Sequence, residues 1–496
     1  MLFDPAHARY DISAFLARRS EWVCRLDGGP PKRVRDEQIS VSFEFGRLIL
    51  FLWGEEFSEC WRVEAYEIRG ERLLLRLERR PGRTATLEIA SAESAGGEAI
   101  EERRRTFANV LGRLIERELG ARIEYVATHR DDAHHLSGAY TRLIFTRRGE
   151  RAIAIAVNLG EPPTRIEGLV TAGLIWWEQA ASSASGAEAR RLVFFAPKGR
   201  ATTVARRLTV LRSDGPRLDL YEVDEQQGTL TAVTPFDQGA LFDPRQMRLP
   251  RPITELPPHP LRDRAMALVP GLLRVARRPG SAVESLRLRG LEIARLSRDR
   301  LFFGLGANKR PLRDNWEEFE RFVHEIARIR HPESQEKTHP AYRLQAERWL
   351  EEVIREDVRR VDPRLDPRFL YPQIPVSETE RYGLVDLLGI TDDGQLALLE
   401  LKTEEDVEAP MQAAEYWLRV EWHRRRGEIT RRGYFPGLKI ADRPTLVLIV
   451  APFLRFHPMF DRVVRWIDPR VPVYKIGIAE EWRKGVRVVY RERANA

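Results

Sequence analysis

The first part of the chain alternates apolar and polar positions in four successive runs. These runs are residues 39–54 (ISVSFEFGRLILFLWG), 60–70 (CWRVEAYEIRG), 71–80 (ERLLLRLERR) and 83–89 (RTATLEI). A period of two, interrupted by glycine-containing turns, is typical of strands with one buried face. We therefore expect a β-rich N-terminal module over residues 1–95, built as a small antiparallel sheet or barrel.

The pattern then changes to alternating helices and strands. Helical periodicity covers 105–119, 166–181 and 202–212, and short apolar strands lie at 140–148, 151–158, 191–197 and 218–223. Apolar strands between helices indicate a sheet that is covered on both faces. This predicts an α/β domain over residues 100–240, followed by a Pro- and Arg-rich linker with a short strand pair and a helix over 241–335.

The last part of the chain, residues 336–496, repeats the same order of elements. A long helix at 339–361 precedes strands at 371–376, 383–390 and 395–402, and helices and strands then alternate through 410–426, 445–452, 453–467 and 471–479. Such a repeat suggests an internal duplication. The copies differ in one respect, because RAIAIAVN (151–158) has no acid where QLALLELK (395–402) holds Glu400.

Three charged residues interrupt the apolar strands of the last part. Glu400 and Lys402 are two positions apart and so project from one face of a strand. Asp386 interrupts the preceding strand, and the turn sequence TDDGQ between the strands predicts a hairpin. Buried charges need a partner or a metal. Two converging carboxylates with an ammonium beside them would suit Mg²⁺ or Mn²⁺, with Lys402 holding or deprotonating an attacking water.

Residues on two flanking helices are further candidates. Helical spacing places Glu347 within the apolar arc of the long helix and Glu351 at its edge, whereas Glu352 points away, so Glu347 or Glu351 could complete the metal shell. Gln412 and Tyr416 are four apart at the start of the next helix, where free N–H groups favour a phosphate.

The combination of VDLLGI, thirteen intervening positions between Asp386 and Glu400, LLELK and QAAEY resembles the PD-(D/E)XK nuclease superfamily. The resemblance covers about Pro340 to Tyr490. It implies a restriction-endonuclease-like core, a mixed sheet flanked by helices, with Asp386 and Glu400 as metal ligands, Lys402 as the catalytic lysine and Gln412 and Tyr416 beside the site. The order of elements along the chain further suggests that Tyr140 to Val223 in the middle α/β unit is a relative that lost its acids. Val385 departs from the family's usual proline.

Composition and charge indicate which class of molecule the protein is expected to bind. The net charge is +8, with 82 basic and 74 acidic residues, and arginine suits phosphate recognition, although GC-rich coding or heat adaptation would give the same bias. Arginines close to the proposed site helix could grip a nucleic-acid strand or simply complement a helix end. They are Arg424, Arg425, Arg426, Arg431 and Arg432. The acidic residues 403–406 (TEED) are expected to form a solvated loop. Only Cys24 and Cys60 are present, which excludes a disulfide framework.

No run reaches the roughly 18 uncharged apolar residues of a membrane helix, and the N-terminus lacks a signal-peptide pattern, so we expect a cytoplasmic protein without a membrane partner. The working hypothesis is a Mg²⁺- or Mn²⁺-dependent endo- or exonuclease acting on nucleic acid, favouring DNA. Two alternatives stay open: a catalytically silent nucleic-acid-binding protein, and an assembly protein that forms a homodimer or engages a partner through its N-terminal two thirds.

Overall fold

The computed structural model describes residues 5–27, 31–35, 38–44, 47–54, 57–80, 83–91, 97–182, 189–234, 242, 247, 249–253, 256–277, 281–306, 309–313, 315–375 and 384–496. Short stretches of the expected linker over 241–335 lie outside these residues. The chain divides into two compact units. The first combines residues 1–97, 251–357 and 481–486, and the second combines 98–250, 358–480 and 487–496.

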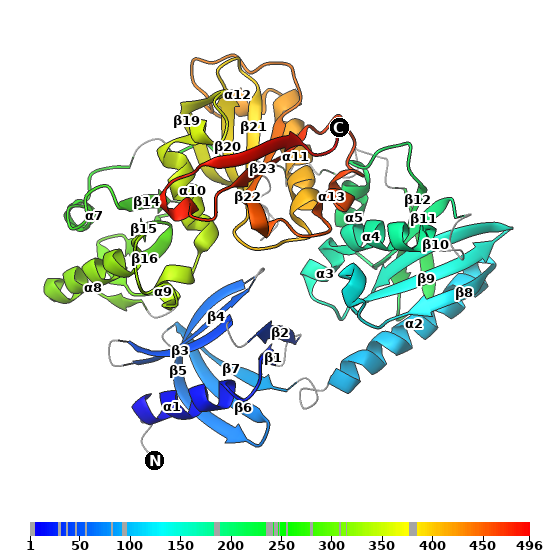
Figure 1. Cartoon of the computed structure of the whole chain (residues 1–496), viewed down its shortest axis with the longest axis horizontal. Coiled ribbons are helices and arrows are strands. Elements are labelled where there is room, and N and C mark those ends of the chain that lie inside the picture. Colours follow the sequence, from blue (N-terminus) through cyan, green and yellow to red (C-terminus); the bar gives the residue numbers. More distant parts are fainter. Residues whose placement is uncertain are drawn as a thin grey trace. The chain divides into compact units, whose positions relative to one another are not determined.

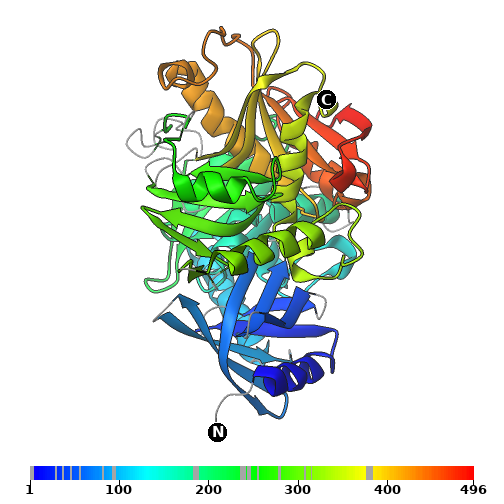
Figure 2. The same cartoon turned by 90° about the vertical axis from the view of Figure 1, so that its left-hand side faces the viewer.

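The N-terminal residues of the first unit form a seven-stranded sheet in which every neighbouring pair is antiparallel. Its order is β2-β1-β7-β6-β5-β4-β3, drawn in blue in Figures 1 and 2. The strands are β1 (Glu21–Leu26), β2 (Lys32–Arg35), β3 (Ile39–Glu44), β4 (Arg47–Gly54), β5 (Phe57–Arg69), β6 (Arg72–Arg80) and β7 (Arg83–Ala90). Helix α1 (Pro5–Leu16) packs Ile12 and Phe15 into the core beneath this sheet, because the alternating strands turn one apolar face toward it.

The first unit also holds a five-stranded antiparallel sheet of order β14-β15-β16-β17-β18, where the sequence predicted only a strand pair. The strands are β14 (Leu273–Arg277), β15 (Val283–Leu288), β16 (Leu291–Ser297), β17 (Arg300–Phe303) and β18 (Arg310–Pro311). The helices are α7 (Pro260–Met266), α8 (Trp316–Ile329), α9 (Pro340–Arg343) and α10 (Ala346–Glu356). Helices α9 and α10, expected with the C-terminal domain, therefore belong to the first unit.

The second unit contains two six-stranded mixed sheets. One has the order β13-β12-β11-β10-β9-β8 and the other β19-β20-β21-β22-β23-β24. We call the first sheet with its helices α3, α4 and α5 the middle half, and the second sheet with α11, α12 and α13 the C-terminal half. In both halves the first three strands are mutually antiparallel, the third, fourth and fifth are parallel, and the sixth returns antiparallel.

The strands and main helices of the two halves follow one another in the same order along the chain. The middle half has β8 (Ala121–Ala127), β9 (Tyr140–Arg147), β10 (Glu150–Val157), α3 (Pro163–Glu167), α4 (Leu169–Ala181), β11 (Arg191–Pro197), α5 (Ala201–Leu208), β12 (Arg217–Asp224) and β13 (Thr229–Val233). The C-terminal half has β19 (Leu365–Pro375), β20 (Leu384–Thr391), β21 (Leu396–Leu401), α11 (Ala409–Arg425), α12 (Glu428–Arg431), β22 (Leu446–Pro452), α13 (Phe460–Val464), β23 (Val473–Ile478) and β24 (Val488–Arg493).

Helices α4, α5, α11 and α13 lie between the two sheets of the second unit (Figure 1). One apolar cluster joins both sheets through these helices, with Ile155, Leu174, Leu398, Met411 and Ile449 among its buried members. Helix α2 (Gly97–Leu119) packs instead on the opposite face of the middle sheet, beside Phe145 and Phe195. The chain is thus a mixed α/β protein with sheets flanked by helices, as the sequence predicts. Among the described residues no helix is long and apolar enough to cross a membrane.

Candidate functional site

The hairpin of β20 and β21 positions the two predicted carboxylates on one face. The register pairs Leu387 with Leu399 and Leu388 with Leu398, so its continuation sets Asp386 opposite Glu400. Side chains alternate along a strand, and Leu388 and Leu398 belong to the core that includes α11. Asp386 and Glu400 therefore face α11.

The turn of this hairpin depends on a glycine. Gly394 has φ +84°, a conformation that L side chains rarely adopt, and a Cβ added there would lie 2.4 Å from the carbonyl oxygen of Lys439. The hydroxyl of Thr391 donates to Asp393 across the same turn. The segment read from sequence as a tight turn thus fixes the register that sets the two carboxylates opposite each other.

The Asp386 carboxylate is anchored by two hydrogen bonds. Its Oδ2 accepts from the backbone N–H of Leu401 at 3.0 Å, and its Oδ1 accepts from Nε2 of Gln373 at 3.1 Å. Gln373 lies in β19 with φ +54°, between residues paired with β20 on either side. Sequence reasoning missed Gln373, because a left-handed residue inside a strand leaves no pattern of alternation to recognise.

Lys402 is held between carboxylates at the end of β21. Its Nζ lies 3.2 Å from Glu400 Oε1 and 2.9 Å from Asp406 Oδ2, and the Glu400 and Lys402 side chains are only 3% and 13% exposed. Burial acts to raise the pKa of Asp406, but the charge and hydrogen bond of Lys402 outweigh it and hold that pKa below its usual value. Asp406 was expected in a solvated loop. Its position four residues after Lys402 was the available signal that it could turn back onto that lysine.

Helix α11 brings two further predicted residues to the same place. Lys402 Nζ donates to Gln412 Oε1 at 3.0 Å, and Gln412 Nε2 donates to the Tyr416 hydroxyl at 2.9 Å. Burial, followed by the negative charge of Glu400 and then of Asp386, raises the pKa of Tyr416. The Tyr416 hydroxyl therefore experiences both carboxylates. The structure joins these five side chains into one polar cluster beneath the start of α11.

The donor set of this cluster is that of a hard cation. Asp386 and Glu400 supply carboxylate oxygens, and Mg²⁺ is commonly held by one or two carboxylates together with waters and substrate phosphate. Among the residues that the structure describes, no group of three His, Cys, Asp or Glu side chains could hold a metal. A cation at Asp386 and Glu400 would therefore need water or phosphate oxygens for the rest of its coordination, and the residues present fit that requirement.

Glu347 and Glu351 lie on α10, in the first unit. Glu351 is buried, and its Oε2 accepts from Arg348 Nη1 at 2.9 Å. Glu352, which helical spacing placed on the outer side, is buried as well, because Arg274 of β14 and Arg355 pair with it from that side. Burial raises the pKa of Glu352. A role of Glu347 or Glu351 in completing a metal shell stays a prediction.

The five arginines after the site helix have different surroundings. Arg424 is half-buried and donates to Glu421 and Asp442 at 2.9 Å, so its charge is committed to local ion pairs. Arg425 and Arg426 are exposed at the end of α11, where Arg425 lies 3.5 Å from Glu421 with 63% of its side chain exposed and Arg426 stacks 4.2 Å above the Trp422 ring. Arg431 is exposed in α12, and Arg432 pairs with Glu428 at 3.5 Å. Arg425, Arg426 and Arg431 are consequently the members most available to a phosphate.

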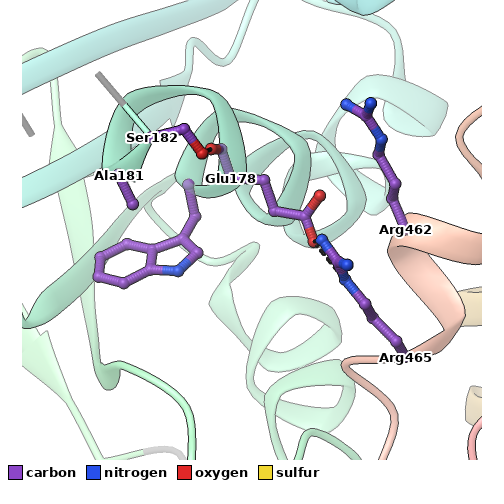
Figure 3. A pocket seen from close by; sticks show the side chains of 6 residues that line it. Glu178, Ala181, Ser182, Arg462 and Arg465 are labelled. Atoms are coloured by element: carbon purple, nitrogen blue, oxygen red, sulfur yellow. Dashed lines mark hydrogen bonds and ion pairs between the residues drawn. The ribbon is translucent and has the colours of Figure 1, made fainter. Parts of the chain in front are cut away.

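A shallow hollow of about 450 Å³ lies elsewhere in the second unit, between α4 and α13 (Figure 3). It is lined by Trp177, Glu178, Ala181, Ser182, Arg462 and Arg465. Glu178 crosses it to accept a hydrogen bond from Arg465 Nε at 2.7 Å, as Figure 3 shows. None of the predicted site residues lines this hollow.

Comparisons with known proteins add little to this geometry. No family model matches the sequence, and no curated protein matches it. A solved structure described as "Structure of EndoMS-dsDNA2 complex" is similar over 41% of this chain and 84% of its own, with 13% identical residues and a TM-score of 0.16. A likeness this weak carries no argument about function.

Proposed function

We propose that this protein is a divalent-metal-dependent nuclease that hydrolyses phosphodiester bonds in nucleic acid, with DNA as the favoured substrate. The proposal rests on one observation above all: Glu400 shares a face with Asp386, and the Lys402 amine lies 3.2 Å from Glu400 and 3.0 Å from Gln412. Two acids and one amine at the end of a buried hairpin are a costly arrangement for a purely structural purpose.

Each residue has a role that follows from its contacts. Asp386, fixed by Leu401 and Gln373, and Glu400 would hold Mg²⁺ or Mn²⁺, which when bound stabilises charge on a phosphoryl oxygen and acidifies a coordinated water. Lys402 donates hydrogen bonds toward a water or a phosphate oxygen beside Glu400. Gln412 orients that amine through its carbonyl oxygen, because its amide N–H is turned to Tyr416.

The direct test is hydrolysis of plasmid and single-stranded DNA with Mg²⁺ or Mn²⁺ by the full chain and by Glu400→Gln. We expect cleavage by the wild type and a loss of at least about 1,000-fold in Glu400→Gln, because the amide removes a ligand charge while keeping the shape. Glu116→Gln, the same isosteric change at an exposed glutamate of α2, is the matched control and should cleave like the wild type.

Two results would contradict the proposal. Cleavage that survives in Glu400→Gln would identify a contaminating nuclease or a different site. Salt-dependent DNA binding without any turnover in Mg²⁺ or Mn²⁺ would favour the catalytically silent nucleic-acid-binding protein instead.

A further inference from the structure

A local two-fold axis relates the middle and C-terminal halves of the second unit. Leu211, just after α5, forms an antiparallel bridge with Ile467, just after α13. The hydrogen bonds around this bridge are reciprocal: the N–H of Asp468 donates to the carbonyl of Val210 at 2.8 Å, and that of Arg212 donates to the carbonyl of Trp466 at 3.0 Å. Any antiparallel bridge has such a reciprocal pattern, but here it joins the segments that follow the corresponding helices α5 and α13.

The helices cross the axis in the same reciprocal manner. Helix α11 packs on α5 of the middle half, and α4 packs on α13 of the C-terminal half. Each contact carries an ion pair, although not at corresponding positions: Arg207 of α5 with Glu415 of α11 at 3.0 Å, and Arg465, directly after α13, with Glu178 of α4 (Figure 3). With identical strand orders, this makes the second unit an internal pair of related copies.

The strand pairings let the two hairpins be compared residue by residue. The strands parallel to the two hairpins both end in Ala-Pro, at Pro197 in β11 and Pro452 in β22. The residues three positions before these prolines are Phe194 and Ile449. Phe194 pairs with Ile155 in the middle half, and Ile449 pairs with Glu400 in the C-terminal half. Ile155 thus occupies the position that corresponds to Glu400, one of the two proposed metal ligands.

The rest of the site is replaced in the same way. The residue across the hairpin from Ile155 is Arg142, whereas the corresponding place in the C-terminal half is Asp386. Two positions further along the central strand, Val157 takes the place of Lys402. The middle half therefore has no carboxylate and no lysine at these three described positions.

The helix that covers each hairpin changes to match. The fourth and eighth residues are Gln412 and Tyr416 in α11, and Ala172 and Trp176 in α4. An alanine and an indole cannot continue the amide and phenol hydrogen bonds. The hydrogen bonds of Gln412 and Tyr416 therefore have no counterpart at these two positions of α4.

A buried arginine, Arg142, occupies the position that corresponds to Asp386, the other proposed metal ligand. Arg142 is 1% exposed, with its guanidinium 5.7 Å from the centre of the Trp176 ring. It pairs with Asp131 at 3.2 Å and donates to the His129 carbonyl, while Gln179 also donates to Asp131 at 3.0 Å. A fixed guanidinium supplies the positive charge there and repels a dication.

From this geometry we infer that the second unit is a fused pair in which only the C-terminal half can hold the divalent cation, so that one chain cuts a single strand of a DNA duplex per encounter. This rests on the proposed function. In the cut, a water oxygen bonds to phosphorus, the bond from phosphorus to the leaving sugar oxygen breaks, and that oxygen takes the proton. A second cut would need a second chain or a second encounter.

The location of the cation is tested without activity, by Mn²⁺ titration of the full chain followed by electron paramagnetic resonance of free Mn²⁺. We expect Asp386→Asn to remove all saturable binding and Asp131→Asn to leave it unchanged. Arg142→Gln should leave it unchanged too, and a thermal melt reports whether that variant is folded. Saturable binding that persists in Asp386→Asn and disappears in Asp131→Asn would overturn the assignment.

Strand selectivity is tested with supercoiled plasmid at low protein concentration. We expect nicked circles to accumulate first, with linear DNA appearing only as a later, independent event. Linear DNA that forms together with the nicked circles would overturn single-strand cutting while leaving the nuclease itself intact. Mn²⁺ bound at Asp386 without any cutting would sink the proposed function and the nicking with it, yet retain the single cation site.

Discussion

The two halves of the second unit share a strand order but bury different side chains at corresponding positions: two acids in one half, an arginine and an isoleucine in the other. The C-terminal half places Asp386 and Glu400 under α11 with Lys402 between acids. The middle half places Arg142 and Ile155 under α4. The difference teaches that the sheet and its covering helix tolerate either two acids with a lysine or an arginine paired with a single acid. The fold therefore does not require the acids, and their presence in one half calls for a chemical explanation.

The largest effect should come from the contact that holds the halves together. Arg207 is buried and pairs with Glu408 at 2.8 Å and Glu415 at 3.0 Å, so Arg207→Met leaves carboxylates of α11 without their counterion across the axis. We expect a loss of about 3–5 kcal/mol in the free energy of unfolding, measured in urea. Arg105→Met, whose partner Glu102 is on the surface of α2, should change little and is the control. If the halves were independent domains, Arg207→Met would destabilise neither by this amount.

The next effect concerns the amine that the middle half lacks. Lys402→Met gives the C-terminal half an uncharged side chain at this position, as Val157 does in the middle half. We expect turnover to fall about 100-fold while duplex affinity changes little. Single-turnover cleavage and equilibrium binding separate the two quantities. Lys439→Met replaces an exposed lysine of the same half and is the matched control. An unaltered cleavage rate in Lys402→Met would remove the functional distinction between the halves.

A smaller effect should come from the exposed arginines that follow α11. In the double variant Arg425→Ala and Arg426→Ala, we expect DNA affinity at low salt to fall about 10-fold and the salt dependence to lessen by up to about two phosphate contacts. Fluorescence anisotropy over a range of NaCl concentrations measures both. Arg424→Ala serves as a contrast, because Arg424 is held by Glu421 and Asp442 and should report on stability rather than on DNA.

The smallest effect is a pH dependence at a contact between the halves. Burial, then the nearby His135 ring, lowers the pKa of His457, although Glu405 and Asp406 oppose this. The two rings are 4.8 Å apart. The unfolded chain therefore binds the proton more readily, so stability falls as pH drops below about 6.5.

Urea unfolding at pH 7.5 and 5.5 measures this dependence. His457→Gln should lose less stability than the wild type over this interval, and an equal loss in both proteins would show that the ring contact does not titrate. The wild type and His457→Gln must be compared because Glu408 also contributes to the pH dependence. Burial raises the pKa of Glu408, so protonation of Glu408 favours the folded state at acid pH and opposes the effect of His457.

Sequence reasoning reached the C-terminal hairpin because its signals are local. Alternation fixes which residues share a face, and the TDDGQ turn fixes the pairing, so the order of residues alone was enough to group Asp386, Glu400 and Lys402. The start of α11 added Gln412 and Tyr416 by helical spacing. The repeated order of elements also indicated the middle half, and the roles of these residues as metal ligands or catalysts stay predictions.

Other features could not be found from the same patterns. Gln373 reaches Asp386 from a left-handed backbone position in another strand, and the pairing of Asp406 with Lys402 depends on the path of a loop. Glu352 is buried because β14, far away in sequence, packs beside α10. The arginine that replaces Asp386 in the middle half was unrecognisable until the ladder pairings gave a residue-by-residue correspondence.

The packing of α11 against the middle half has a practical consequence for expressing fragments of the protein. Helix α11 is buried nearly all round, with α5 of the middle half on one side and its own sheet on the other, so loss of the middle half would uncover part of the shared apolar core and leave Glu415 without Arg207. An expression fragment starting at residue 358 would present that helix to solvent and should be insoluble. A catalytic fragment would have to begin upstream of β8, near residue 98, and keep both halves on one polypeptide.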